Sequence, residues 1–271
     1  MSNIKNGQSP ARIGLVLSAG GLRGAAHLGV LRRLLQAEVP IDLMVGVSAG
    51  AIIAAYYAAV GLTVDELIRL AEDFRGRHII MHGLTLRAAP WAQPWLRRFC
   101  GVIPERLRQL DEARFDRLHH GVRALGIVCH ELRTNRPVYF VTGRRHLATL
   151  AEAVKASAAI PGVIPARTIE RRGEKVCLVD GGISDPLPVD FARSDGLGAT
   201  HVIVSDCCSR VPEPPVGNNV VYMRPELDDV GALRSPRATL LRAVAAGEAA
   251  VTPAVLRRIK SWMEKPAGAR P

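Results

Sequence analysis

Short apolar runs alternate with longer amphipathic segments in the first quarter of the chain. The runs at 12–18 and 41–47 contain few polar residues, which is typical of strands buried on both faces of a parallel sheet. A glycine-rich turn and an amphipathic helix over 22–38 follow the first run. A helix over 49–60, which we expect to be buried all round, follows the second. This order of strand, helix, strand and helix predicts parallel strands joined by right-handed crossovers.

The rest of the chain predicts further elements of the same kind of fold. Residues 63–116 are expected to be helical and rich in loops, with prolines as breaks. Beyond them we expect two strands that suit a hairpin (123–132 and 136–143), a helix (150–160), a strand running into a turn (175–188), a buried strand (200–206) and a basic amphipathic helix (255–265). The alternation favours one α/β domain with a mainly parallel central sheet flanked by helices.

Composition and charge narrow the class of partner. The chain has 271 residues, of which 48% are hydrophobic, and this is ample material for a core. Its net charge of +11 implies attraction to polyanions such as nucleic acid, anionic lipid or acidic substrates, and a merely solvated basic surface explains it equally well. Aromatic residues are scarce, and neither a zinc-finger spacing nor an RNA-binding signature occurs. Nucleic acid is therefore the weaker candidate partner.

Cysteine usage and the absence of a leader pattern predict a cytoplasmic protein. The five cysteines are Cys100, Cys129, Cys177, Cys207 and Cys208. Their odd number and the lack of a Cys-x-x-Cys motif indicate reduced thiols and neither a disulfide framework nor a metal site. Residues 43–64 carry no charge over a length that would span a bilayer, but glycines interrupt them. A buried strand, a tight turn and a buried helix explain this stretch better.

Ser48 lies in a Gly-x-Ser-x-Gly frame between a predicted strand and a predicted helix. The flanking Gly46 and Gly50 lack side-chain bulk, which a sharp strand-to-helix turn requires. Such a turn presents the serine hydroxyl at the end of the strand and at a helix N-terminus, where negative charge is favoured. The residues alone leave two interpretations open: a nucleophile, or a serine that caps the helix in a small-residue turn.

A second glycine-rich turn follows the first predicted strand. Gly20 and Gly21 end the strand and Gly24 opens the helix, with Leu22 and Arg23 between them. Backbone N–H groups of such a loop can point into one concavity that binds an anion, and for acyl transfer that concavity is an oxyanion hole. The loop fits neither a dinucleotide fingerprint nor a P-loop. A tight turn with a solvated arginine is the structural alternative.

Asp180 follows another apolar strand and precedes two glycines. At the carboxyl end of a neighbouring parallel strand, its carboxylate would reach the Ser48 hydroxyl. The alternative role for this residue is simply to initiate a turn.

Together these motifs resemble the patatin-like phospholipases. That family combines a glycine-rich oxyanion loop ending in Arg or Lys and then Gly, a Gly-x-Ser-x-Gly elbow about two dozen residues later, and a distal Asp-Gly-Gly or Asp-Gly-Ala. The segment at 155–166 also resembles the family's Ala-Ser-x-Ala-x-Pro segment. The resemblance covers roughly residues 12–206, which we take as the catalytic core, with 207–271 as a C-terminal helical extension of the same domain.

The resemblance implies a three-layer sandwich and a Ser–Asp dyad that works without histidine, metal or cofactor. Ser48 would attack a lipid ester, phospholipid or lysophospholipid, and Asp180 would act as the base. The glycine loop would bind the oxyanion, and Arg23 would orient the loop or a phosphate head group. The chain departs from the family at Ala19, where a glycine is common, and at Pro186, which removes one N–H donor.

Two other functions stay open. A thioesterase or acyltransferase with the same elbow would normally need a histidine, and His201 is the only one after Asp180. We expect His201 to be structural, His27 to be packed or solvated, and the histidines of the segment 78–82 to lie on the surface or in a lid. The second alternative is a regulatory protein of this fold that binds without catalysis.

Two segments combine aromatic and basic residues, which suits an anionic membrane interface. They are 76–104 and the last amphipathic helix, 255–265. For the helix we favour packing of its apolar face on the core. The role of 76–104 is left open, and with it the question of peripheral membrane contact.

Overall fold

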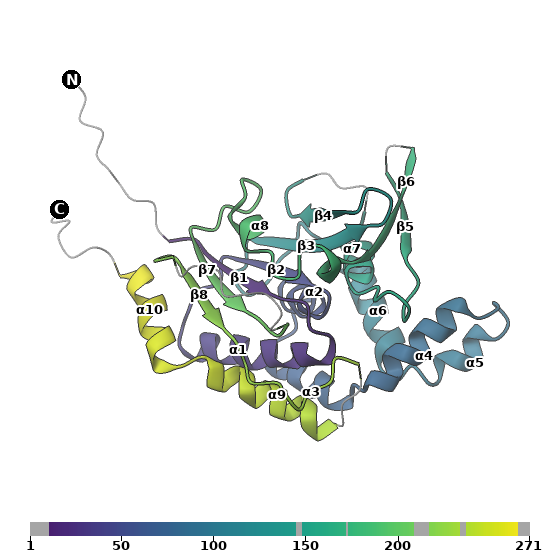
Figure 1. The fold of residues 1–271 in the computed structure, drawn as a ribbon, viewed down its shortest axis with the longest axis horizontal. Helices are drawn as coiled ribbons and strands as arrows, with labels where there is room; N and C mark the ends of the chain where they lie inside the picture. Colours follow the sequence, from purple (N-terminus) through teal and green to yellow (C-terminus); the bar gives the residue numbers. More distant parts are fainter. Residues whose placement is uncertain (1–10, 145–147, 172, 209–216, 234–236, 265–271) are drawn as a thin grey trace.

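The fold is a three-layer α/β sandwich built on one mixed sheet (Figure 1). The computed structural model describes residues 11–144, 148–171, 173–208, 217–233 and 237–264. Within them the sheet has eight strands in the order β5-β6-β3-β2-β1-β7-β8, and β4 pairs with β3. The strands are β1 (Ile13–Leu17), β2 (Leu43–Val47), β3 (Ala124–Glu131), β4 (Arg136–Val141), β5 (Arg167–Arg171), β6 (Glu174–Asp180), β7 (His201–Ser205) and β8 (Val220–Met223).

Five strands, β3, β2, β1, β7 and β8, are mutually parallel, which confirms the mainly parallel sheet. The predicted hairpin is the antiparallel pair β3 and β4. Strands β5 and β6 form a second antiparallel pair at the edge of the sheet. Alternate residues of β1 point to opposite layers: Leu15 packs in the larger core and Val16 in the smaller one. This two-sided burial explains why the strand reads as an uninterrupted apolar run.

Helices cover both faces of the sheet. They are α1 (Ala25–Gln36), α2 (Ala49–Ala55), α3 (Val64–Asp73), α4 (Gly76–Arg87), α5 (Gln93–Arg97), α6 (Ile103–Glu112), α7 (Leu150–Ser157), α8 (Val189–Arg193), α9 (Arg237–Ala250) and α10 (Pro253–Met263), with short helical turns η1 (Gly21–Gly24), η2 (Tyr56–Val60) and η3 (Gly181–Ile183). Helix α8 packs on one face, while α1, α2 and α7 pack on the other. Helices α4 and α5 project from the body of the molecule (Figure 1).

Strands β2 and β6 approach each other end to end along the same edge of β3. Val47, the last residue of β2, pairs with Val128, and Asp180, the last residue of β6, pairs with the next residue, Cys129. Strand β4 occupies the opposite edge of both β3 residues. Because β2 runs parallel to β3 and β6 runs antiparallel, the two carboxyl ends meet. The expectation that Asp180 ends a neighbouring parallel strand is therefore wrong.

Three further details differ from the sequence predictions. Strand β8 lies in the region 207–271, for which the sequence predicted a helical extension without a strand, and it extends the sheet beside β7. The helix over 49–60 is not buried all round, because Ile52 is 38% exposed. Pro94 and Pro104 lie in the first turns of α5 and α6, where a missing N–H costs nothing, so they begin helices instead of interrupting them. The division of the domain at residue 206 stays a prediction.

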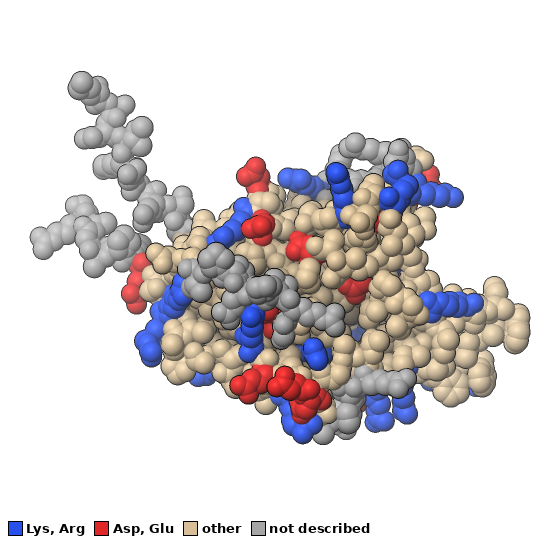
Figure 2. Space-filling view, viewed as in Figure 1, with Lys and Arg blue, Asp and Glu red and all other residues tan. Residues whose placement is uncertain are grey.

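The C-terminal helix α10 packs as expected, with Ile259 fully buried and Trp262 half-buried against the core. Among the described residues no single helix is long and apolar enough to cross a bilayer, although α9 and α10 together meet that criterion despite a bend of 57° between them. Lys and Arg side chains are spread over the face seen in Figure 2, with acidic side chains among them. That face has no single basic patch.

Candidate active site

The elbow at Ser48 is a tight turn between β2 and α2. Ser48 has φ 53° and ψ −117°, in the region of positive φ that a non-glycine residue enters only at a cost. A Cβ on Gly46 would overlap the backbone of Gly50, and a Cβ on Gly50 would overlap the carbonyl of Leu17. The surrounding close packing thus holds Ser48 in a strained conformation, at the N-terminus of α2.

The Ser48 hydroxyl donates a hydrogen bond to Asp180. The distance between Ser48 Oγ and Asp180 Oδ2 is 2.6 Å. The other carboxylate oxygen, Oδ1, accepts from the backbone N–H of Gly182 at 2.8 Å. Both residues are buried. The two residues that the sequence singled out, separated by more than a hundred positions, are therefore in direct contact.

Ser157 supports the elbow in a way that the sequence analysis did not foresee. Its hydroxyl accepts from the backbone N–H of Ser48 at 2.9 Å and donates to the carbonyl of Val128 at 2.6 Å. Ser157 is fully buried at the end of α7. It lies in the segment 155–166 that carries part of the resemblance, but a serine in such a segment has no pattern that reveals which backbone group it contacts.

Burial raises the pKa of Asp180 above its ordinary value near 3.8. The hydrogen bonds from Ser48 and from the N–H of Gly182 oppose this effect, because they favour the charged form. A carboxylate with a raised pKa is a stronger base than one in water, and the proton that it would accept is already within hydrogen-bonding distance.

The glycine loop offers two free backbone donors. The N–H groups of Gly20 and Gly21 have no acceptor among the described residues. The N–H of Leu22 donates to the carbonyl of Ala232 at 2.8 Å, and that of Arg23 donates to Gly20 at 3.2 Å. Leu22 and Arg23 are therefore not available as oxyanion donors in this conformation, because their N–H groups hold the loop itself in place.

The loop packs beside both residues of the dyad. On one side, the N–H of Ala19 donates to the carbonyl of Pro186 at 3.1 Å, and a Cβ on Gly182 would lie 2.9 Å from that of Ala19. On the other side, a Cβ on Gly24 would lie 2.6 Å from the Cβ of Ala49, next to the nucleophile. The departure from the family at Pro186 thus removes a donor but keeps the backbone carbonyl that fixes the loop.

A buried histidine, His27, contacts the residues that lead into the glycine loop. His27 is fully buried, its Nε2 lies 3.0 Å from the carbonyl oxygen of Ser18, and its Nδ1 lies 2.7 Å from Ser205 Oγ. Because a carbonyl only accepts, Nε2 carries the proton and Nδ1 accepts from the Ser205 hydroxyl. Burial lowers the pKa of His27 to about 4, so the ring is neutral at pH 7. The Arg23 side chain donates to the carbonyl of Val230 at 2.7 Å, which agrees with a role in orienting the loop.

A cavity of about 270 Å³ extends from Ser48 between the helices. Gly21 and Gly24 line it beside the serine, and the exposed side of Ile52 faces it. Most of the remaining wall is aliphatic or aromatic and comes from Leu28, Ile53, Leu67, Leu70, Phe74, Ile79, Val102, Leu107, Val154 and Ile160. The volume and the apolar wall suit a hydrocarbon chain whose polar end reaches Ser48.

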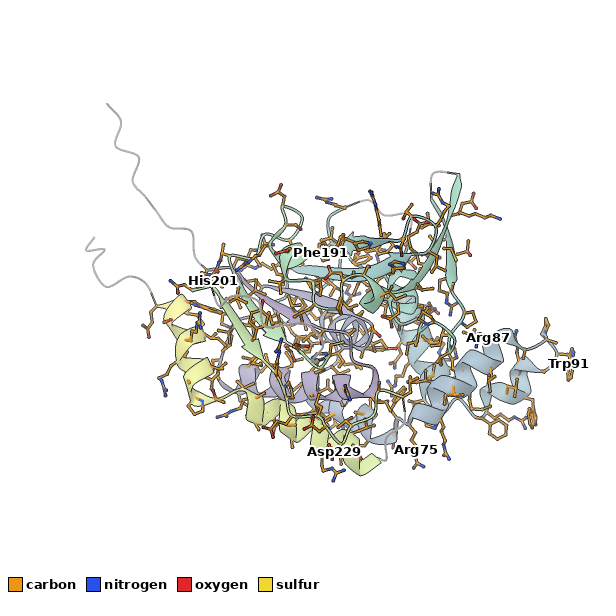
Figure 3. The ribbon with its side chains drawn as sticks, viewed as in Figure 1. Arg75, Arg87, Trp91, Phe191, His201 and Asp229 are labelled. Carbon is orange, nitrogen blue, oxygen red and sulfur yellow. The ribbon has the colours of Figure 1, made fainter. Side chains whose placement is uncertain are left out.

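His201 and the dyad lie at opposite ends of the sheet. His201 is the first residue of β7, and β7 runs parallel to β2, whose last residue precedes Ser48. The ring of His201 contacts that of Trp262, with 4.9 Å between their centroids. Figure 3 labels His201. The expected structural role of His201 agrees with this position.

The two histidines of the segment 78–82 lie on α4. His78 is buried, so the surface alternative is wrong for it while the lid alternative stays a prediction, and it accepts from the N–H of Arg75 through Nδ1. His82 lines the cavity. Among the described residues no group of three or more His, Cys, Asp or Glu side chains is placed to hold a metal ion. All five cysteines are free thiols.

Fold and site together define a class: α/β proteins that carry a serine on a nucleophile elbow, bonded to a carboxylate and flanked by a glycine-rich loop. The model of the patatin-like phospholipases matches residues 15–193. The chain belongs to the patatin-like phospholipase family.

The chain is similar to proteins described as members of an NTE family. An uncharacterized NTE family protein of Mycobacterium bovis is 31% identical over 244 residues, which cover 84% of this chain and 61% of that relative. The neuropathy target esterase sws of Drosophila melanogaster is 27% identical over 210 residues, which cover 73% of this chain and 13% of the esterase. The chain thus spans only part of the length of these relatives.

A solved structure confirms the fold. The crystal structure of VipD from Legionella pneumophila matches 93% of this chain and 67% of that chain, with a TM-score of 0.57 and 15% sequence identity. At this identity the likeness extends to the fold alone.

Proposed function

We propose that this chain hydrolyses carboxyl esters of lipids, phospholipids or lysophospholipids, through an acyl-enzyme on Ser48. The observation that carries the proposal is the 2.6 Å hydrogen bond from Ser48 to Asp180 at an apolar cavity. Membership of the patatin-like phospholipase family supports the same reaction class, as does the esterase among the similar proteins.

In the first half-reaction Ser48 Oγ attacks the ester carbonyl while its proton passes to Asp180 Oδ2. The carbonyl oxygen becomes an oxyanion, which the N–H groups of Gly20 and Gly21 stabilise together with the N-terminus of α2. Collapse of this intermediate expels the alcohol, which takes the proton from Asp180. The acyl group remains on Ser48.

In the second half-reaction water replaces the alcohol. Asp180 accepts a proton from the water as it attacks the acyl carbonyl, the same N–H groups stabilise the second oxyanion, and Ser48 Oγ leaves with the returning proton. The carboxylic acid is released. The acyl chain lies along the aliphatic wall of the cavity throughout.

Release of fatty acid from a lysophospholipid tests this proposal. Wild type is expected to release it, Ser48→Ala to lose release by at least about a thousandfold, and His201→Ala to retain it, because His201 starts β7 at the other end of the sheet. Activity that depends on His201 and not on Asp180 would favour the histidine-assisted acyltransferase. Unimpaired physiological function of Ser48→Ala would favour the binding protein.

We further propose that the hairpin of α4 and α5 contacts anionic membranes, and that the protein is cytoplasmic and binds them peripherally. Trp91 is 85% exposed at the projecting end of this hairpin (Figure 3). Trp95 and Phe99, whose rings contact each other, are also exposed. Arg97 and Arg98 are exposed among them. Exposed indole rings beside cations match the chemistry of a lipid head-group region.

A further inference from the structure

The cavity beside Ser48 carries a group of basic side chains on its otherwise apolar wall. Arg106 from α6, Lys155 from α7, Arg167 from β5 and His82 from α4 all line it. Four separate elements therefore each contribute a basic residue to the wall of one space. An apolar cavity that served a hydrocarbon chain alone would gain nothing from these groups, because each charge loses hydration there.

Two of these side chains have buried donors without acceptors. The Nε atoms of Arg106 and Arg167 are inaccessible to solvent and have no hydrogen-bond partner among the described residues. Arg106 donates from a terminal nitrogen to Gln109 at 2.7 Å, which does not neutralise its charge. A buried guanidinium N–H without an acceptor is costly, and an anion bound beside these two guanidinium groups would offset that cost through their charge.

The remaining basic residues are already compensated. Lys155 forms an ion pair with Asp111. Burial lowers the pKa of His82 to about 4, with further lowering by the nearby charges of Arg167 and Lys155, so His82 is neutral at pH 7. Among the described residues, Arg106 and Arg167 are thus the basic residues of the cavity wall whose positive charge has no ion-pair partner.

Each arginine lies on an element that contacts a segment leading to one residue of the dyad. The hydroxyl of Tyr56 donates to the carbonyl of Arg106 at 2.5 Å, and Tyr56 lies about 12 Å along the helical segment that begins after Ser48. Arg167 pairs with Leu178 of β6, the strand that ends at Asp180. Because Ser48, Arg106 and Arg167 line the same cavity, one amphiphilic molecule can contact the serine and the arginines at the same time.

We propose that Arg106 and Arg167 form a binding site for the anionic oxygen group of an amphiphilic substrate, whose hydrocarbon chain fills the same cavity. The inference rests on the proposed function and narrows its substrates to esters that carry a phosphate or carboxylate. Guanidinium groups suit this task because their planar donors match the oxygens of both anions.

Binding of decyl phosphate, which is not a carboxyl ester, tests the site without turnover. Isothermal titration calorimetry would compare decyl phosphate, decanol and inorganic phosphate, each below any micelle-forming concentration. Wild type is expected to bind decyl phosphate at least about tenfold more tightly than either of the other two compounds. Arg106→Gln and Arg167→Gln should each remove most of this preference and leave decanol affinity unchanged.

Matched variants separate the site from general charge effects. Arg108→Gln removes an exposed arginine of the same helix, paired with Glu105, and is expected to change nothing. Arg167→Lys keeps the charge and should keep part of the preference. Equal affinity of wild type for decyl phosphate and decanol would overturn the inference, as would an equal loss in Arg108→Gln. Inorganic phosphate that binds as tightly as decyl phosphate would also overturn the inference, since the hydrocarbon chain would then contribute nothing to binding.

Labelling of Ser48 by a fluorophosphonate keeps this inference distinct from the proposed function. A labelled serine in a protein that binds decyl phosphate no better than decanol refutes the anion site and leaves the hydrolase intact. An unlabelled serine together with arginine-dependent decyl phosphate binding refutes the hydrolase and supports the site. Thermal unfolding of each variant shows whether it is folded.

Discussion

The buried carboxyl group of Asp180 has opposite consequences for reaction and stability. Burial raises its pKa in the folded protein above the ordinary value near 3.8. A group of this kind favours folding below its unfolded pKa, and the contribution is lost as the pH rises through the folded pKa. At pH 7 the charged carboxylate therefore destabilises the folded protein, and the proposed reaction is what requires it.

Replacing Asp180 by Asn should separate these two effects. Asn can accept from Gly182 and donate to Ser48, so the contacts of 2.8 and 2.6 Å survive without the charge. We expect ester hydrolysis to fall by about a hundredfold to ten-thousandfold while Tm at pH 7 stays equal or rises. Initial rates and a thermal scan measure both. A lower Tm of Asp180→Asn would contradict the conclusion that the buried charge destabilises the fold.

The pH dependence of kcat/KM reports the same group. Only the ionised form of Asp180 can accept the serine proton, so kcat/KM should fall as the pH drops through a pKa above 3.8. His201→Ala should show the same acidic limb as wild type. An acidic limb that disappears in His201→Ala would assign the base to histidine instead.

At the scale of residues, the sequence indicated that Ser48 and Asp180 would meet, but not which other contacts hold the site in place. Gly46, Ser48 and Gly50 could be read from their spacing, since only a sharp turn needs that frame. The support from Ser157 could not, because a side-chain to backbone contact across the fold leaves no local pattern. The occupied N–H of Leu22 depends on Ala232, far along the chain, and was equally invisible.

At the scale of elements, the meeting of β2 with β6 could not be derived from the sequence. Each apolar run predicted a strand, but strand direction follows from pairing, and the pairing of β6 with Cys129 to Glu131 of β3 is non-local. The short strand β8 was missed because four residues give too little periodicity, and its partner β7 alone makes it a strand.

The hairpin of α4 and α5 carries a prediction of its own. Trp91→Ser with Trp95→Ser should weaken binding to vesicles of equal parts phosphatidylcholine and phosphatidylglycerol by about tenfold, because both indoles are exposed and would enter the interface. Cosedimentation measures the change. Leu132→Ser, at an apolar residue that is 49% exposed on the turn after β3, is the control and should bind like wild type. Unchanged binding of the double variant would contradict the membrane proposal.

At the scale of the whole molecule, the buried ring of His27 makes stability depend on pH. Its folded pKa of about 4 lies below the ordinary 6.5, so between these values the unfolded chain binds a proton that the folded chain does not. Stability should therefore decline as the pH falls from 6.5 toward 4, by about 3 kcal/mol from this residue.

His27→Gln tests this expectation. The variant cannot gain that proton, so its free energy of unfolding should depend less steeply on pH between 4 and 6.5, even though lost contacts with Ser18 and Ser205 lower its absolute stability. Denaturant unfolding at several pH values gives both curves. Parallel curves for the variant and wild type would show that His27 is not the group responsible.

The architecture as a whole was the part best predicted from the sequence. Continuous apolar runs such as 12–18 and 41–47 arise because both faces of the parallel sheet are covered, and that burial follows from β1 and β2 lying in its middle. The cavity was not predicted. It depends on how α2, α4, α6 and α7 pack over the sheet, and a cavity wall has the same aliphatic composition as a core.

The measurement that tests the central claim most directly is mass analysis after treatment with a fluorophosphonate. Wild type, Ser48→Ala and Asp180→Asn would be compared as folded proteins, with the adduct mapped at the peptide level. The account predicts a single adduct on Ser48, absent from Ser48→Ala and formed much more slowly in Asp180→Asn, because Asp180 accepts the proton at 2.6 Å. Folded wild type that forms no adduct, or one that forms equally fast without the Asp180 carboxylate, would contradict it.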